Sequence, residues 1–253
     1  MLRLKRLSRT APAIVRSFGP LQHGSHKTTN RFLDFYKLGS KDAIEKERAR
    51  LADEMNRGYF ADINELKKHG GKIAIANKNL TPVTTSVMFP AIDVDCPDGA
   101  TLKLPIVGNN AHESNPPKAT LICLSFRASA QAMIDTWSIP FFESFRNSSK
   151  VQLYEMSFID SWLLSLYPIR RLLLKIMRKS NFNGEQDELQ KRIVYKFGDH
   201  YYFRKELKIL NLLTGYIFLV DSFGRIRWQG FGLATEDELS SLLSCTSLLL
   251  EDK

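Results

Sequence analysis

One uninterrupted apolar run, residues 119–126 (ATLICLSF), is the feature that most constrains the fold of this chain. A run of this length without alternation is typical of a strand that is buried on both faces of a sheet. Residues 129–141 then have apolar side chains at helical spacing, and residues 151–157 alternate as a second strand. A strand, a helix and a strand in this order favour a parallel pair, so the pattern predicts an α/β fold.

The patterns around this unit complete the plan of a domain over residues 88–253. Residues 101–107 alternate as a strand, and residues 215–229 contain an apolar run, a turn and an alternating run that predict a hairpin. A final helix begins after Thr235. The order is that of a thioredoxin-like fold: a mixed central sheet flanked by helices, with residues 158–213 predicted as a long helical insertion before the final hairpin.

Two segments precede this domain. Residues 1–30 contain Arg, Ser, Thr and Leu but no acid, which predicts a mitochondrial transit peptide. The alternative for these residues is a disordered basic tail that binds nucleic acid or membrane. Residues 31–87 predict a charged helical arm and a linker, because Ser40 is a suitable helix cap and Gly70 follows a second helical stretch.

The positive charge of the chain is concentrated in two places. The sequence has 36 Lys and Arg against 27 Asp and Glu, a net charge of +9. Seven of those bases lie in the first 31 residues, so the rest has 29 bases against 27 acids. Residues 170–208 alone contain eleven bases and five acids. The distribution therefore indicates a leader and one local basic surface rather than a generally basic domain that binds nucleic acid.

The local basic surface follows Pro168, a favoured first residue of a helix. Apolar side chains recur there at i, i+3, i+4 and i+7, with basic side chains opposite them. Two interpretations stay open: the apolar side chains pack on the sheet, or they rest in an anionic headgroup layer or bind an apolar partner helix. The candidate membrane or partner surface consists of Trp162, Leu166, Ile169, Arg171, Leu172, Leu173, Lys175, Ile176, Arg178 and Lys179.

The positions that carry thiol chemistry in this fold contain no cysteine. A thioredoxin-like thiolate lies where the first central strand meets its helix, and here residues 126–130 read FRASA. Arg127 and Ser129 in this loop predict either an anion site at a helix N-terminus or a serine-capped helix with an exposed arginine. His200 is interpreted as an ordinary surface or core histidine, since no Ser/Asp partner lies at a recognisable spacing.

The three cysteines do not predict a disulfide framework or a zinc site. Cys96, Cys123 and Cys245 are an odd number and lie far apart. Cys123 falls inside a predicted buried strand, where a thiol behaves as a small hydrophobe. An enzyme alternative stays open, namely a mitochondrial thiol oxidoreductase or peroxidase that uses Cys96 or Cys123. The sequence predicts no catalytic residue, no cofactor and no metal ligand.

Four stretches together are similar to one known family. Residues 89–93 (FPAID), 124–133 (LSFRASAQAM), 172–177 (LLLKIM) and 215–228 (GYIFLVDSFGRIRW) resemble the tenth-named assembly factor of the mitochondrial F-type ATP synthase. The resemblance implies a non-catalytic protein, peripheral on the matrix side of the inner membrane. It implies that the chain helps membrane-sector subunit a, also called subunit six, to join the ring of c subunits. It implies no cofactor, small-molecule substrate or nucleic acid.

Overall fold

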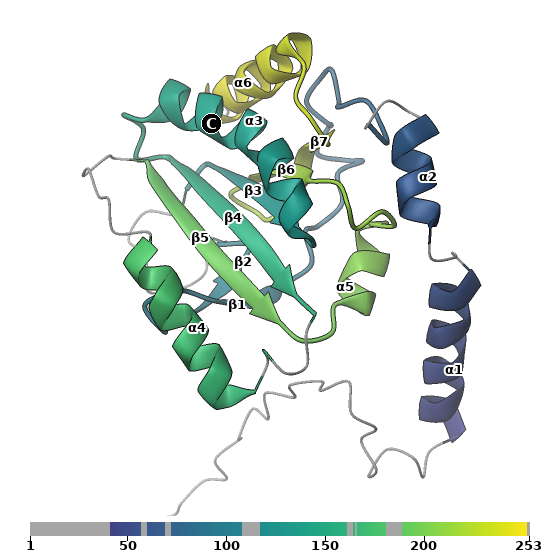
Figure 1. Cartoon of the computed structure of the whole chain (residues 1–253). Helices are drawn as coiled ribbons and strands as arrows, with labels where there is room; N and C mark the ends of the chain where they lie inside the picture. The colour runs from purple at the N-terminus through teal and green to yellow at the C-terminus, as the bar shows by residue number, and fades with distance from the viewer. Residues whose placement is uncertain are drawn as a thin grey trace, which may run out of the picture.

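A seven-stranded mixed sheet organises the computed structural model, with the strand order β2-β1-β5-β4-β3-β6-β7 (Figure 1). The structure describes residues 41–56, 60–68, 72–107, 117–160, 164, 166–180 and 189–251. The strands are β1 (Ile92–Asp95), β2 (Thr101–Leu104), β3 (Ala119–Ser125), β4 (Val151–Ile159), β5 (Gln190–Phe197), β6 (Tyr216–Asp221) and β7 (Ile226–Phe231). The helices are α1 (Lys41–Asn56), α2 (Ala61–Lys68), η1 (Ala128–Ala130), α3 (Gln131–Phe145), α4 (Tyr167–Ser180), α5 (Tyr201–Glu206) and α6 (Glu236–Glu251). The predicted leader, residues 1–30, lies outside the described residues.

The centre of the sheet agrees with the prediction from the apolar run. All seven residues of β3 are buried, and β3 pairs in parallel with β4 and antiparallel with β6. β4 pairs in parallel with β5, and β6 and β7 form the antiparallel hairpin. A β-α-β unit followed by a hairpin and a helix, with helices against a mixed sheet, is the thioredoxin-like plan, so the predicted fold class is confirmed.

Two hydrophobic clusters hold the layers together, one on each face of the sheet. On one face α3 and α6 cover the strands, and the Trp137 ring of α3 packs edge-on against Trp228 of β7 with 5.6 Å between ring centroids. On the other face Phe89, which precedes β1, packs against Phe203 of α5 and Phe218 of β6. α4 lies in front of the β1–β5 side of the sheet in Figure 1, on the same side as α3.

The expectation that residues 158–213 are a wholly helical insertion is wrong at residues 190–197. These residues form β5, which lies between β4 and β1 in the sheet. Lys191, Arg192 and Lys196 give the segment the composition of an exposed helix. The decisive residues are Val194, which is completely buried, and its β-branched and aromatic neighbours, which favour a pleated strand between two partners. The insertion therefore contributes α4, α5 and a strand.

The linker that follows the arm is part of the folded domain. The backbone N–H of Asn77 donates to the Gln229 carbonyl at 3.0 Å, and that of Thr81 donates to the Arg227 carbonyl at 2.7 Å. These bonds run along the outer edge of β7. The indole of Trp228 also donates to the Asn77 carbonyl at 2.6 Å. Residues 72–87 consequently close one edge of the sheet.

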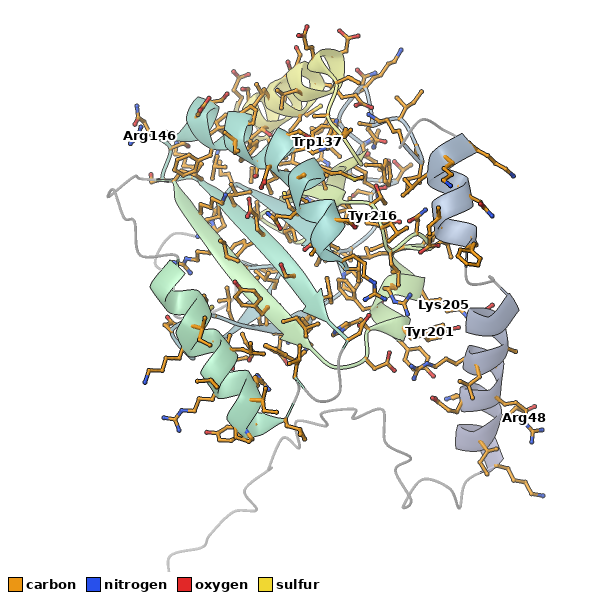
Figure 2. All side chains as sticks on the ribbon, viewed as in Figure 1. Arg48, Trp137, Arg146, Tyr201, Lys205 and Tyr216 are labelled. Carbon is orange, nitrogen blue, oxygen red and sulfur yellow. The ribbon has the colours of Figure 1, made fainter. Side chains whose placement is uncertain are left out.

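The arm itself is attached to α5 by polar contacts. The side chain of Arg50 in α1 forms an ion pair with Asp199, and both side chains are almost completely buried. The Tyr201 hydroxyl donates to Asp53 of α1 at 2.7 Å. Figure 2 shows Tyr201 and Lys205 of α5 on the side that faces α1. These contacts join two segments that lie about 150 residues apart in the sequence, at separations of 148 to 152.

Candidate functional site: the α4 surface and the strand end without a thiol

One side of α4 is fixed to the sheet by a charged and an apolar contact. Arg170 forms an ion pair with Asp95 at the end of β1, and its guanidinium lies 5.4 Å from the Phe197 ring centroid of β5. Leu174, one turn further along the helix, is only 8% exposed. Because residues four apart lie on one helix face, these two side chains define the side that packs on the sheet.

The predicted apolar stripe lies away from that side. Leu172 is 58% exposed and Ile176 is 57% exposed, while Ile169 and Leu173 are half-buried at the margin. Leu166, just before the helix, is also exposed. Of the two interpretations of the stripe, packing of its whole length on the sheet is therefore wrong.

The inward-facing contacts were not predicted from the sequence. Leu174 belongs to the run Leu172–Leu173–Leu174, in which periodicity alone cannot select the buried member. Arg170 was counted only as a basic residue, since its partner Asp95 lies 75 residues earlier in the chain.

The basic side chains of the predicted surface divide into two groups. Arg171 and Lys175 are exposed, and among the residues that the structure describes no carboxylate pairs with either. Arg178 and Lys179 fall within the backbone of α4, but their side chains lie outside the described part, as does all of Trp162. The described surface of α4 is thus an apolar ridge with two exposed cations beside it.

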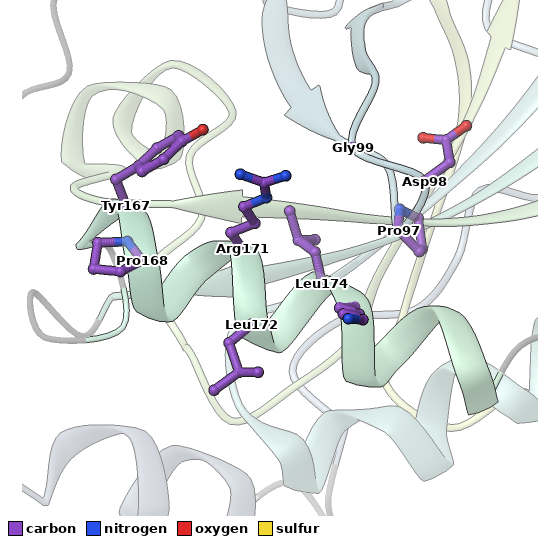
Figure 3. Close-up of a pocket in the computed structure, with 9 residues that line it drawn as sticks. Pro97, Asp98, Gly99, Tyr167, Pro168, Arg171, Leu172 and Leu174 are labelled. Atoms are coloured by element: carbon purple, nitrogen blue, oxygen red, sulfur yellow. The ribbon is translucent and has the colours of Figure 1, made fainter.

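A hollow of about 680 Å³ lies between α4 and the turn that joins β1 to β2 (Figure 3). Arg171 and Leu172 project from opposite sides of the helix in this view. The lining consists of Pro97, Asp98, Gly99, Tyr167, Pro168, Arg171, Leu172, Leu174 and Lys175. The lining includes one carboxylate, that of Asp98, besides the cations Arg171 and Lys175.

The loop after β3 has neither a thiol nor the expected serine cap. Arg127 occupies the N-cap position of η1 without a capping hydrogen bond from its side chain, and Ala130 occupies that of α3. Ser129 is exposed within η1. The prediction that Ser129 caps the helix is wrong, because a short 3-10 turn separates this serine from the first residues of α3. Arg127 is exposed as predicted, and its Nη1 lies 3.5 Å from Oδ2 of Asp160.

The three thiols are held in their neutral form. Burial raises the pKa of Cys123 well above its usual range, and nearby Glu155 acts in the same direction. Burial is also the main cause of the raised pKa of Cys96 and of Cys245. Because the thiolate is the nucleophile, a raised pKa makes each cysteine poorly reactive at neutral pH. This arrangement is unsuited to thiol exchange.

His200 is a buried neutral histidine. Burial, reinforced by the charge of Lys196, lowers the pKa of His200 to about 3. Its Nε2 lies 3.7 Å from Oδ1 of Asp160 and has no hydrogen-bond partner in the part of the chain that the structure describes. The Phe158 ring contacts the imidazole, with 4.6 Å between centroids. A buried base of this pKa is poorly placed for proton transfer near pH 7.

The described ranges contain neither a metal-binding cluster nor a helix that could span a membrane. No three His, Cys, Asp or Glu side chains there lie close enough together to hold a metal ion. Within the same ranges, no helix combines the length and the apolar character that a bilayer span requires.

Several solved structures are similar to this chain at low identity. A putative protein disulfide isomerase from Bacteroides thetaiotaomicron is 13% identical, with 65% of this chain and 89% of that chain covered and a TM-score of 0.40. A putative thiol:disulfide interchange protein DsbE from Chlorobium tepidum is 10% identical, with 65% and 96% covered and a TM-score of 0.41. BsSco, described as a member of the Sco family of cytochrome c oxidase assembly proteins, is 15% identical, with 67% and 96% covered and a TM-score of 0.42.

Sequence comparison is more specific. No curated protein sequence matches the chain closely enough to count as a relative. The model of the family described as "ATP10 protein" matches residues 9–249. Since that match spans nearly the whole sequence, the chain belongs to the ATP10 family of ATP synthase assembly factors.

Proposed function

We propose that this chain promotes the incorporation of subunit a (subunit six) into the membrane sector of the mitochondrial ATP synthase, where subunit a joins the ring of c subunits. The proposal includes a location on the matrix side of the inner membrane, to which the chain binds peripherally. The observation that carries it is the family match over residues 9–249.

The chemistry of the described residues supports a binding role without catalysis. The thiols of Cys96, Cys123 and Cys245 have raised pKa values, and the β3 end that would hold a redox cysteine reads FRASA. Peripheral binding to a membrane needs an exposed apolar contact. The α4 ridge, with Leu172 and Ile176 exposed, offers one.

Loss of the chain provides the direct test. In cells that lack it, we expect the catalytic sector and the c-ring to accumulate while subunit a is missing from the complex on native gels. A deletion strain that assembles a complete ATP synthase with subunit a at its normal level would refute the proposal.

A cysteine-free variant separates this function from the enzyme alternative. We expect C96A/C123A/C245A to restore the incorporation of subunit a, because no thiol takes part. A variant that folds with the wild-type circular dichroism spectrum but fails to restore assembly would favour a thiol oxidoreductase instead. Restoration by the wild-type chain in the same strain is the matched control.

A further inference from the structure

We propose that α4 binds the surface of a membrane that contains anionic phospholipids. Leu172 and Ile176 enter the headgroup layer, and Arg171 and Lys175 contact the lipid phosphates. Helices with an apolar face and cationic flanks bind membranes in this way, parallel to the surface. The inference deepens the proposed function by naming a lipid contact, but it does not depend on any role in assembly.

The ridge has the dimensions of an interfacial anchor. α4 has 14 residues, which at 1.5 Å per residue gives a length of about 21 Å. Leu172 and Ile176 lie on adjacent turns of one face, and more than half of each side chain is exposed. Tyr167 at the start of the helix is 73% exposed, and tyrosine is a favoured residue at the boundary between lipid and water.

The rest of the domain prevents this ridge from turning inward. Arg170 is held by Asp95 and by the face of the Phe197 ring, and Leu174 is buried beneath the helix. A rotation that buried Leu172 would expose Leu174 and separate the ion pair. The apolar exposure is therefore a fixed property of the folded chain.

The positive charge of the side chains beside Leu172 and Ile176 favours binding to an anionic surface. There is no acidic residue from position 161 to position 184, so α4 itself contains only basic charges. Arg170 is neutralised by Asp95, whereas Arg171 and Lys175 have no carboxylate partner among the described residues. Two cations that no described carboxylate pairs, beside an apolar ridge, complement lipid phosphates above acyl chains.

The shape of the surface favours lipid over a protein helix. A partner helix docks in a groove that receives its own apolar ridge. The hollow beside α4 lies against residues 97–99, and Arg171, Leu172 and Lys175 line it on the helix side. Ile176 does not line it. The ridge is thus continuous with the hollow at Leu172 and leaves it at Ile176, so the hollow does not run along both residues. A surface of this shape matches deformable lipid better than a second rigid helix.

Vesicle flotation of the full chain tests the proposal. The vesicles are pure phosphatidylcholine or phosphatidylcholine with about one-third anionic phospholipid. We expect binding to the anionic vesicles and about 30-fold weaker binding by R171Q/K175Q, since each cation near such a surface contributes about 1 kcal/mol. We expect L172E/I176E to lose at least tenfold in binding. L210E/L248E is the matched control, because Leu210 and Leu248 are 62% and 52% exposed elsewhere and the charge change is the same.

A local readout separates α4 from the basic leader. In I176W, the fluorescence of the tryptophan at position 176 should be quenched by brominated acyl chains in anionic vesicles. The fluorescence of the tryptophan at position 210 in L210W should not be quenched. The wild-type signal is subtracted in both cases, because the chain has tryptophans of its own. If I176W floats with the vesicles but its tryptophan fluorescence is not quenched, the proposal is overturned, because another segment must then bind the membrane. Equal binding of L172E/I176E and L210E/L248E would also overturn it. Binding to neutral vesicles that is insensitive to R171Q/K175Q would overturn it as well, because Arg171 and Lys175 would then contribute nothing to lipid binding.

Discussion

Acidification should weaken the folded state through His200, and the structure sets the sign of the effect. Burial, then Lys196 and Arg204, disfavour the charged imidazole, while Asp199 favours it. The Asp160 carboxylate, 3.7 Å from Nε2, is the other charged group that contacts the ring. The result is a folded-state pKa of about 3 against an ordinary value of 6.5. Because the unfolded chain then binds the extra proton, stability is complete above pH 6.5 and falls as the pH decreases toward 3.

The size of the effect follows from linkage. Each pH unit below 6.5 costs about 1.4 kcal/mol of unfolding free energy until the folded-state pKa is reached. Between pH 7.5 and pH 5.0 the contribution of His200 is therefore about 2 kcal/mol. Asp and Glu groups change stability over the same range, so the wild-type slope alone is not diagnostic.

Urea denaturation of wild type and H200L at several pH values isolates the imidazole. Leucine retains the apolar contacts around Phe158 but does not titrate, and all other groups are common to both chains. We expect the stability difference to change by about 2 kcal/mol in favour of H200L from pH 7.5 to pH 5.0. Parallel curves for the two chains would show that the native imidazole accepts a proton freely, and the assignment of a buried neutral histidine would be wrong.

Three further predictions follow from named contacts. In urea denaturation L174A should lower the free energy of unfolding by about 2–3 kcal/mol and L172A by less than about 0.5 kcal/mol, because only Leu174 is buried. Equal losses in the two variants would contradict the orientation of α4. R50A should leave the buried Asp199 carboxylate without its ion-pair partner, so the amides of α1 should exchange hydrogen faster. R50A/D199N should recover much of the protection, because the unpaired charge is removed. Unchanged exchange in R50A would contradict the contact between α1 and Asp199. Cys123 should resist a thiol reagent at pH 8 in the native protein and react in urea, so fast native labelling would contradict its burial.

Local patterns were sufficient to predict the centre of the fold. The apolar run of β3 has one interpretation, because a strand buried on both faces needs no polar alternation. β4 was predicted as a strand from its alternation, although the structure buries residues on both of its faces. β5 was missed because its sequence, QKRIVYKF, shows no alternation of polar and apolar residues. Its strand character depends on β4 and β1 as neighbours, which are distant in sequence.

The candidate surface could be predicted in composition but not in orientation. The residues of α4 predict an amphipathic basic helix. Which side of the helix packs on the sheet depends on contacts with Asp95 and Phe197, which are distant from parts of the helix in sequence. The docking of α1 through Arg50 and Asp199 is likewise a long-range ion pair without a local signal. The end of β3 needs no structure to be interpreted, because the sequence alone shows that residues 126–130 contain no cysteine.

The strip of linker along β7 also fixes where an autonomous fragment can begin. A fragment starting at residue 88 would lack the Asn77 and Thr81 amides that saturate the outer carbonyls of β7. It would also lose the Ala76 N–H and the Lys72 ammonium, which hold the buried Glu238 carboxylate at the start of α6. An exposed strand edge of this kind pairs with other chains and promotes aggregation. A fragment that keeps this edge of the sheet covered must therefore include the residues from Lys72 onward.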